Sequence, residues 1–190
     1  MPASPPAPSD LPEPVDDGAA DHLRGMRAPA VTLLATHGEP VRLDQLRATR
    51  AVICAYPRTG PPGQGPLAPG WDQIPGARGC TPESCGFRDH HAKPVALGAE
   101  VYGLSTQDTA CPREVGTPLG LPFPQLSDST LRLTTAWRLP ARVAAGRTLL
   151  RRLTVVLPAG LVEHVWYPVL PPDRPATEAV GGLAGRAETF

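Results

Sequence analysis

The sequence has few aromatic residues, no excess charge of either sign and no long apolar run. Phe, Trp and Tyr make up 5% of its 190 residues, which is too few for the stacking platforms of single-strand nucleic-acid binders. Lys and Arg number 18, as do Asp and Glu, and this balance argues against a nucleic-acid groove or a polybasic membrane surface. Charged residues interrupt every apolar stretch before the ~18 residues that suggest a membrane-spanning helix. We therefore expect a soluble protein with neither nucleic acid nor membrane as a partner.

Cysteine is also scarce, with four residues in the chain. Four thiols in a chain of this length are too few for a disulfide scaffold. The N-terminal residues show neither the basic nor the apolar region of a secretory signal, so we expect a cytoplasmic, reducing compartment. In such a compartment a cysteine pair is typically catalytic, redox-sensing or metal-binding.

Proline and glycine are abundant, at 26 and 19 residues, but they are concentrated in two segments. Residues 1–21 are rich in Pro and Asp and nearly free of large apolar side chains, which predicts a disordered tail. Residues 57–79 contain six prolines and six glycines, a composition that favours a functional loop or an insertion over a regular element. The remainder, residues 22–190 with this loop included, has the length of one ordinary domain.

Within that domain, strand patterns alternate with helix patterns. The alternation, followed by a terminal hairpin and helix, predicts an α/β domain of three layers with a mixed central β-sheet flanked by helices. Residues 51–56 form a continuous apolar run that is typical of a central strand, with Cys54 as a buried packing thiol. The expected strands are 31–34, 51–56, 99–104, 153–157 and 161–167, and the expected helices are 81–98 (kinked at Pro94), 108–119, 128–138 and 176–183.

The informative motif is GCTPESCGFRD at residues 79–89, in which Cys80 stands just before a helix start and Cys85 follows five residues later. Thr81 suits the cap position, Pro82 the first helical position, and an acid follows in the first turn. The free N–H groups and the dipole at a helix start favour an anion, so a thiolate at Cys80 gains several tenths to ~1 kcal/mol. The thiolate is the reactive form of cysteine.

Spacing alone leaves this pair open between a redox couple and two incidental cysteines. Five residues of intact helix rise ~7.5 Å, which exceeds the ~7 Å Cα separation that a disulfide tolerates. Oxidation of the pair therefore requires part of the helix to unwind. No metal site is expected, because zinc ligand pairs usually have two to four intervening residues and no second ligand pair is visible. Cys111, near another helix start, is expected to be incidental.

The wider pattern resembles the peroxiredoxin family, and more narrowly its peroxiredoxin Q, or bacterioferritin comigratory protein, branch. The resemblance rests on Tyr56-Pro57, on residues 79–89, on GAEVYGLS at 98–105, and on PFPQLSD at 122–128 with the strand and turn at 152–160. It implies a thioredoxin-like fold and a thiol-dependent peroxidase that needs no cofactor. It also implies hydrogen peroxide or organic hydroperoxides as substrates and a thioredoxin-type dithiol as reductant, in a monomer or weak homodimer.

Residue by residue, Cys80 matches the peroxidatic cysteine, Cys85 the resolving cysteine, and Arg152 the arginine that orients peroxide and stabilises the thiolate. Cys80 would become a sulfenic acid that Cys85 converts into an intramolecular disulfide.

One position departs from the family pattern. The family places a threonine three residues before the peroxidatic cysteine, where this chain has Ala77. Thr59, Arg78 and Thr81 are the candidates to orient substrate in its place. The missing hydroxyl keeps two alternatives open, namely a thiol-disulfide oxidoreductase and a redox-sensing switch without efficient peroxidase activity. A purely structural thioredoxin-like domain is the remaining alternative.

Overall fold

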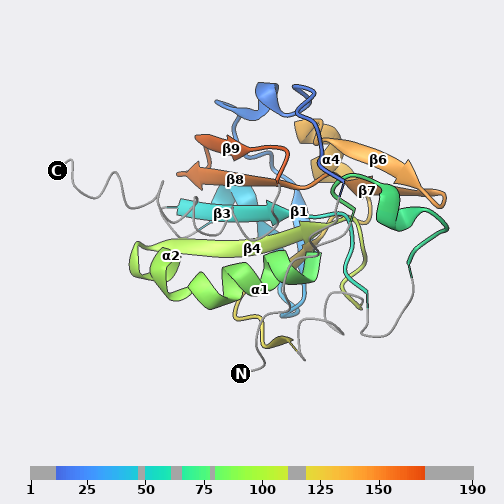
Figure 1. The fold of residues 1–190 in the computed structure, drawn as a ribbon. Helices are drawn as coiled ribbons and strands as arrows, with labels where there is room; N and C mark the ends of the chain where they lie inside the picture. Colours follow the sequence, from blue (N-terminus) through green and yellow to red (C-terminus); the bar gives the residue numbers. More distant parts are fainter. Residues whose placement is uncertain (1–11, 47–49, 61–65, 78–79, 111–118, 170–190) are drawn as a thin grey trace.

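A mixed sheet of seven strands forms the centre of the molecule (Figure 1). The computed structural model describes residues 12–46, 50–60, 66–77, 80–110 and 119–169. The strand order is β2-β1-β5-β4-β3-β8-β9; β3, β4 and β5 run parallel, and the other neighbours are antiparallel. The strands of this sheet are β1 (Thr32–Ala35), β2 (Val41–Arg42), β3 (Arg50–Ala55), β4 (Ala99–Ser105), β5 (Gln125–Ser127), β8 (Leu153–Pro158) and β9 (His164–Trp166).

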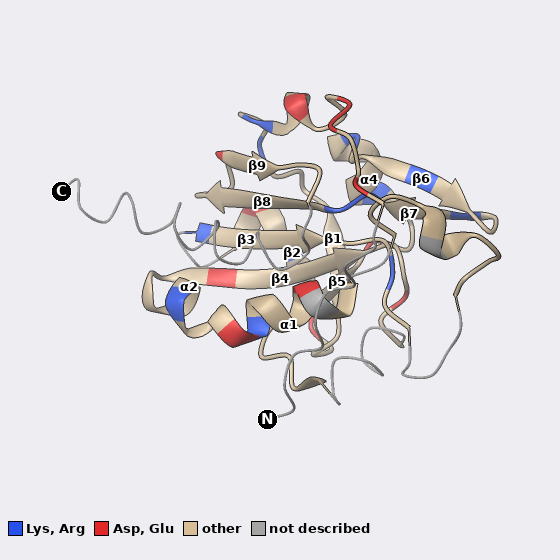
Figure 2. Cartoon of the chain, viewed as in Figure 1, with Lys and Arg blue, Asp and Glu red and all other residues tan. Residues whose placement is uncertain are grey.

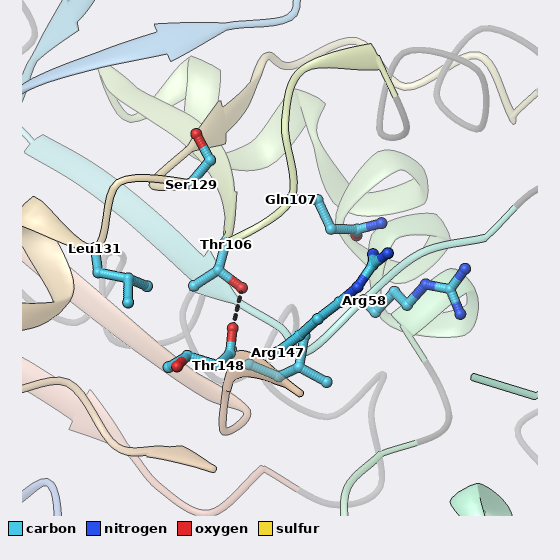
Figure 3. A pocket seen from close by; sticks show the side chains of 8 residues that line it. Arg58, Thr106, Gln107, Ser129, Leu131, Arg147 and Thr148 are labelled. Carbon is cyan, nitrogen blue, oxygen red and sulfur yellow. Dashed lines mark hydrogen bonds between the residues drawn. The ribbon is translucent and has the colours of Figure 1, made fainter. Parts of the chain in front are cut away.

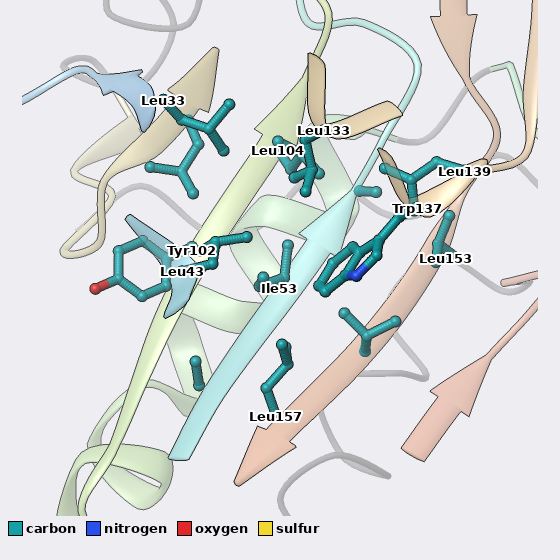
Figure 4. Packing of buried hydrophobic residues seen from close by; sticks show 14 of the residues in the cluster. Leu33, Leu43, Ile53, Tyr102, Leu104, Leu133, Trp137, Leu139, Leu153 and Leu157 are labelled. Carbon is teal, nitrogen blue, oxygen red and sulfur yellow. The ribbon is translucent and has the colours of Figure 1, made fainter. Parts of the chain in front are cut away.

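Helices cover both faces of this sheet. Phe87 on α1 packs with Val52 on one face, whereas Leu133 and Trp137 on α4 pack with Ile53 on the other (Figure 4). This arrangement confirms the three-layer α/β architecture with a mixed sheet. The α-helices are α1 (Cys80–His90), α2 (Ala92–Ala96) and α4 (Arg132–Trp137), and short 3₁₀ helices span η1 (Asp21–Leu23), η2 (Leu43–Gln45) and η3 (Trp71–Gln73).

Strand β3 is covered on both faces, as its continuous apolar sequence predicts. Ile53 belongs to the larger core, and Val52 and Cys54 belong to the smaller core under α1. Successive side chains of a strand point to opposite faces, so a strand between two helical layers needs apolar residues at every position. The expectation that Cys54 is a packing thiol is confirmed by its 3% exposure.

Helix α1 begins one residue earlier than the sequence pattern predicts. Cys80 is its first residue, so the predicted cap at Thr81 is wrong and Pro82 stands at the third position. Proline is tolerated there because the first N–H groups of a helix have no acceptor within it.

The single kinked helix expected over 81–98 is also wrong: α1 ends at His90, and α2 follows after one residue. Pro94 lies four residues after His90, and its ring is incompatible with continued helical bonding to that carbonyl. Gly98, with φ of 70°, ends the pair.

Two further elements differ from expectation, whereas the terminal hairpin β8–β9 is confirmed. Residues 125–127, which are not among the expected strands, form β5 because β4 and β1 offer it hydrogen-bonding partners on both sides. A two-stranded sheet of β6 (Ala141–Ala144) and β7 (Arg147–Leu150) escaped the sequence analysis, since its burial alternates only weakly.

Helix α4 starts later than residue 128 because Asp128 caps it from a distance. The Asp128 carboxylate accepts hydrogen bonds from the backbone N–H of Leu133 at 3.1 Å and of Thr134 at 2.7 Å. It also accepts the Thr134 hydroxyl at 2.6 Å. The aspartate therefore satisfies the free N–H groups of the first turn, while Leu131, at φ of 58°, separates the two.

The described parts of the predicted tail and insertion loop contact the domain. Asp17 pairs with Arg151, and Trp71 and Ala77 form a small core with Leu149 of β7. The tail boundary at residue 21 and the extent of the insertion stay predictions. The helix expected at 176–183, most of that expected at 108–119, and Cys111 lie outside the described residues. None of the helices in the described ranges is long and apolar enough to cross a membrane.

Candidate active site

Cys80 and Arg152 meet in the interior of the molecule. Arg152 lies in the two-residue link between β7 and β8, and Cys80 opens α1. The Arg152 Nη2 atom donates to Cys80 Sγ at 3.2 Å and approaches the Gly76 carbonyl oxygen at 3.5 Å. The two residues are only 4% and 2% exposed. A cation thus lies directly beside the sulfur, in a setting where water screens the interaction little.

Glu83 completes this arrangement from the same turn of α1. Its Oε2 forms a buried ion pair with Arg152 Nη1, while its Oε1 is buried without a hydrogen-bond partner in the described part of the chain. Burial raises the pKa of Glu83 to about 7, against the opposing effect of Arg152. Burial works to lower the pKa of Arg152, but the charges of Glu83 and Cys80 outweigh it and raise that pKa. Arg152 therefore keeps its positive charge and contacts both the Glu83 carboxyl and the Cys80 sulfur.

Tyr56, at the end of β3, closes another side of the site. Its hydroxyl donates to Gln125 Oε1 at 2.9 Å, and burial, followed by the charge of Cys80, raises its pKa. Gln125 lies across β4 at Gly103, where an added Cβ would stand 1.8 Å from Oε1. Only glycine leaves room for this amide, so the neutral Tyr56 hydroxyl is positioned by the backbone of β4.

The residues predicted to orient substrate differ in their burial and in their contacts. Thr59 is buried and held by Gln107, whose Oε1 accepts the Thr59 N–H at 2.8 Å and the hydroxyl at 3.4 Å. The Thr59 hydroxyl also acts on Tyr56 as a hydrogen-bonding neighbour. Thr81 is half-buried in the first turn of α1, and Arg78 lies outside the described residues. Ala77 contributes its carbonyl, which the Cys80 thiol approaches at 3.9 Å.

Cys85 lies deeper in the molecule, with 0% exposure. Five residues along an α-helix turn the side chain by about 140° and advance it by ~7.5 Å, so Cys80 and Cys85 point to different sides of α1. Arg88 is the neighbour of Cys85: its pKa is raised first by a hydrogen bond to Asp89 and then by the charge of Cys85. Cys54, Cys80 and Cys85 are not joined to one another by disulfides.

This geometry supports nucleophilic chemistry at sulfur. The Arg152 guanidinium and the free N–H groups at the start of α1 lie beside one buried sulfur atom. Such fixed donors stabilise negative charge that develops during a displacement. Among the described residues no three His, Cys, Asp or Glu side chains are grouped to hold a metal ion.

Sequence reasoning missed the partners of the predicted residues. Glu83 was visible only as an acid in a helix's first turn, and its pairing with Arg152 joins positions 69 residues apart. Gln107 and Gln125 carried no signal, because an isolated glutamine has no characteristic pattern. The glycine at 103 inside an apolar strand was the one available sign of a close approach.

A model of the Redoxin family matches residues 23–180. The chain belongs to the redoxin family. Its relatives include the chloroplastic peroxiredoxin Q of rice, 32% identical over 152 residues that cover 80% of this chain and 62% of the relative. The chloroplastic peroxiredoxin Q of Arabidopsis thaliana is 29% identical over 158 residues, covering 83% and 65%. The chain thus spans less than two thirds of the length of these relatives. The resemblance to the peroxiredoxin Q branch is confirmed.

Solved structures of this redoxin family share the fold. Peroxidoxin BcpB of Mycobacterium tuberculosis superposes with a TM-score of 0.69 at 23% identity, covering 86% of this chain and 97% of that one. Peroxiredoxin Q of Xanthomonas campestris gives 0.65 at 20% identity, covering 95% and 100%. These likenesses confirm the thioredoxin-like α/β fold.

Proposed function

We propose that this protein is a thiol peroxidase that reduces hydrogen peroxide or organic hydroperoxides at Cys80. The observation that carries the proposal is the 3.2 Å contact between the Arg152 guanidinium and the buried Cys80 sulfur at the start of α1. Two kinds of relative support it: the peroxiredoxin Q proteins and the Xanthomonas campestris bacterioferritin comigratory protein, which is described with alkyl peroxide reduction activity.

In the first step, the Cys80 thiolate attacks one oxygen of the O–O bond. That bond breaks, the departing oxygen takes a proton to leave as water or an alcohol, and sulfur is oxidised to sulfenic acid. Arg152 donates to the sulfur in the ground state and is placed to stabilise charge on the departing oxygen. The Tyr56 hydroxyl, kept neutral by burial, donates its proton to Gln125 and adds no charge beside the site.

In the second step, the Cys85 thiol condenses with the sulfenic acid, forming a disulfide and releasing water. The intact α1 keeps the two sulfurs apart, so its first turns must open. Its sequence favours opening, because Thr81, Ser84 and Gly86 are weak helix formers. Opening also separates Glu83 from Arg152, which ties this end of α1 to the β7–β8 link. A thioredoxin-type dithiol then reduces the disulfide and is itself oxidised.

The decisive experiment is stopped-flow oxidation of the reduced protein by hydrogen peroxide, followed by peptide mass analysis. Cys80→Ser should abolish the fast phase, and Cys85→Ser should retain it and accumulate the sulfenic acid. Cys54→Ser is the matched control, since that thiol is packed in the core under α1 and should leave the fast phase intact. Oxidation no faster than that of a free thiol, or a wild-type product without a Cys80–Cys85 disulfide, would overturn the proposal.

Thr59 is our candidate for the hydroxyl that Ala77 lacks. It is buried, near Tyr56, and its bond to Gln107 through the hydroxyl is long at 3.4 Å, so the hydroxyl is only weakly engaged. Thr59→Val should slow peroxide oxidation about 10-fold or more, as expected when one donor to the transition state is lost, and Thr59→Ser should restore it. Equal rates for the two variants would exclude Thr59 from substrate orientation.

The alternative function is exchange with protein disulfides, and the buried Ala77 at the threonine position favours it. Without that hydroxyl, a thiol at a helix start remains a competent partner for disulfides. Faster reaction of Cys80 with a disulfide-bonded protein than with any hydroperoxide would make exchange the function.

A further inference from the structure

A pocket that is lined by two arginines, Arg58 and Arg147, opens next to Gln107, the residue that holds Thr59. It lies at the carboxyl ends of the parallel strands β3, β4 and β5, where clefts of open α/β sheets commonly bind ligands. The β6–β7 hairpin forms its other wall, and its volume is about 240 Å³. Figure 3 shows its lining residues, which come from four separate segments: Arg58, Thr106, Gln107, Ser129, Leu131, Arg147, Thr148 and Leu149.

Arg58 and Arg147 are the charged residues among the described residues of this lining, and none of those residues is acidic. Within the described parts of the chain neither arginine has an ion-pair or hydrogen-bond partner, and the Nε atom of Arg58 is buried without one. Both residues line this pocket, Arg58 from the segment after β3 and Arg147 from the start of β7 (Figure 3). Like charges that share a site repel one another, and a bound anion would relieve this repulsion.

The surrounding sequence is positively charged over a long stretch. Between Asp128 and Glu163 the chain contains six arginines and no acidic residue. Arginine colours the β6–β7 hairpin blue in Figure 2, with no acidic position on its strands. Such a stretch raises the local concentration of anions.

The other polar groups of the lining do not compete for the arginines. The carbonyl oxygen of Thr148 accepts the Thr106 hydroxyl at 2.7 Å (Figure 3). The Gln107 oxygen accepts from Thr59, so each of these oxygens already accepts a hydrogen bond within the protein. Ser129 adds a hydroxyl at the rim, and Leu131 and Leu149 supply apolar surface.

We propose that this pocket binds an oxyanion, a carboxylate or a phosphate group, between Arg58 and Arg147. The planar guanidinium fork matches both groups through paired N–H···O bonds. The volume of about 240 Å³ lies below the ~300–1,000 Å³ of pockets for drug-sized ligands. The site therefore takes a small acid or the charged end of a longer molecule.

The pocket shares Gln107 with the candidate active site. Gln107 lines the pocket and also holds Thr59. Its side-chain oxygen accepts the Thr59 N–H at 2.8 Å, and its side-chain nitrogen donates to the Thr59 carbonyl oxygen at 2.8 Å. Arg58 is two residues from Tyr56. The oxyanion thus comes from one of two sources: the carboxylate of an acidic organic hydroperoxide, or a free anion. The site itself does not depend on the proposed peroxidase function; only the substrate source rests on it.

The first test measures binding of inorganic phosphate to the reduced protein by isothermal titration calorimetry, at constant ionic strength set with KCl. Saturable binding is expected in wild type, weakened about 10-fold or more in Arg147→Gln. Arg132→Gln removes the same charge from an exposed position on α4 and should bind as wild type does. Arg147→Lys keeps the positive charge but lacks the planar guanidinium, so its affinity for phosphate should lie between those of wild type and Arg147→Gln. Near-ultraviolet circular dichroism verifies that each variant is folded.

The second test identifies the source by comparing a fatty-acid hydroperoxide with its methyl ester in single-turnover oxidation of Cys80. A preference for the acid that Arg147→Gln abolishes identifies the substrate carboxylate, whereas phosphate binding without such a preference identifies a free anion. Absence of both, or effects equal in Arg147→Gln and Arg132→Gln, overturns the site. Hydrogen peroxide serves as the uncharged reference: if wild type fails to react with it, the peroxidase function is lost while the phosphate result still stands.

Discussion

Arg151 and Arg152 are neighbours in the sequence but occupy opposite environments. Arg151 points to the surface, where it pairs with Asp17 and lies 5.1 Å from the Tyr167 ring centroid. Arg152 points inward, where its side chain and that of Glu83 are each 1% exposed. The first pair fastens the N-terminal segment to the outside of the domain; in the second, Arg152 also contacts the Cys80 sulfur.

The difference shows how burial decides the role of an ion pair. Water and salt screen the Asp17–Arg151 pair, so it stabilises the fold only slightly. The Glu83–Arg152 pair is costly to desolvate and yields little net stability. It makes the removal of either partner severe, however, because the other charge remains buried.

The largest effect is expected from Arg152→Gln. The change leaves the Glu83 carboxyl and the Cys80 sulfur buried without their cation, which should cost about 3–5 kcal/mol of unfolding free energy. Urea denaturation of the reduced protein at pH 8 measures this loss. The oxidation rate of Cys80 by hydrogen peroxide should fall by roughly 100-fold or more. Arg151→Gln is the matched control, and a similar loss in both variants would refute the comparison.

Glu83→Gln should change how stability depends on pH. The folded-state pKa of about 7 lies above the ordinary 4.5, so between these values the folded state binds more protons than the unfolded state. Stability due to Glu83 is therefore lost as pH rises from about 4.5 to about 7. As pH rises across this window, the unfolding free energy of the variant should therefore increase relative to that of wild type by on the order of 1–3 kcal/mol. Urea unfolding of both proteins at pH 5, 6 and 7 measures the trend; a constant difference would contradict it.

Gly103→Ala tests how closely the inner region is fitted. The new Cβ meets the Gln125 amide at 1.8 Å, so Gln125 must move and release Tyr56, at a cost of about 1–3 kcal/mol. Thermal unfolding measures the loss. In the double variant Gly103→Ala with Gln125→Ala, the clash disappears, so the second substitution should recover stability. If it instead adds a further independent loss, the crowding is not the cause.

The smallest effect belongs to Asp17→Asn at the surface. The hydrogen bond from Arg151, followed by that from Tyr167, lowers the pKa of Asp17 from 3.8 to about 2. The stabilisation is thus present above about pH 3.8 and is lost as pH falls through about 2. At pH 7 the unfolding temperature should fall slightly, and 1 M KCl should shrink the difference. If Asp17→Asn lost as much stability as Arg152→Gln, the surface pair would contribute as much to folding as the buried one, contrary to the comparison.

The layers of the fold and the position of Cys80 at a helix start were predictable, because both leave local patterns; the chemical roles of Cys80 and Cys85 stay predictions. A continuous apolar strand identified β3, and a cysteine at a helix start identified Cys80.

The partners of these residues were not predictable, because they depend on contacts across the fold. Glu83 meets Arg152 only after β8 pairs with β3, and Gln125 reaches Tyr56 only across Gly103. The hairpin β6–β7 was missed because its strands are half exposed, so apolar alternation is weak. The boundary of α1 moved by one residue, which is the usual uncertainty of a helix end.

The burial of Cys54 makes it a reporter of a different event. It lies on β3 between β4 and β8, and burial, then the charge of Glu83, raises its pKa well above that of an ordinary thiol. An alkylating reagent can reach it only when α1 lifts from its face of the sheet or the sheet itself opens. With Cys80 and Cys85 replaced by serine, the rate at which Cys54 is alkylated under native conditions therefore reports how often the core under α1 opens. The sulfur that takes no part in the proposed chemistry thus measures the opening of the scaffold that supports it.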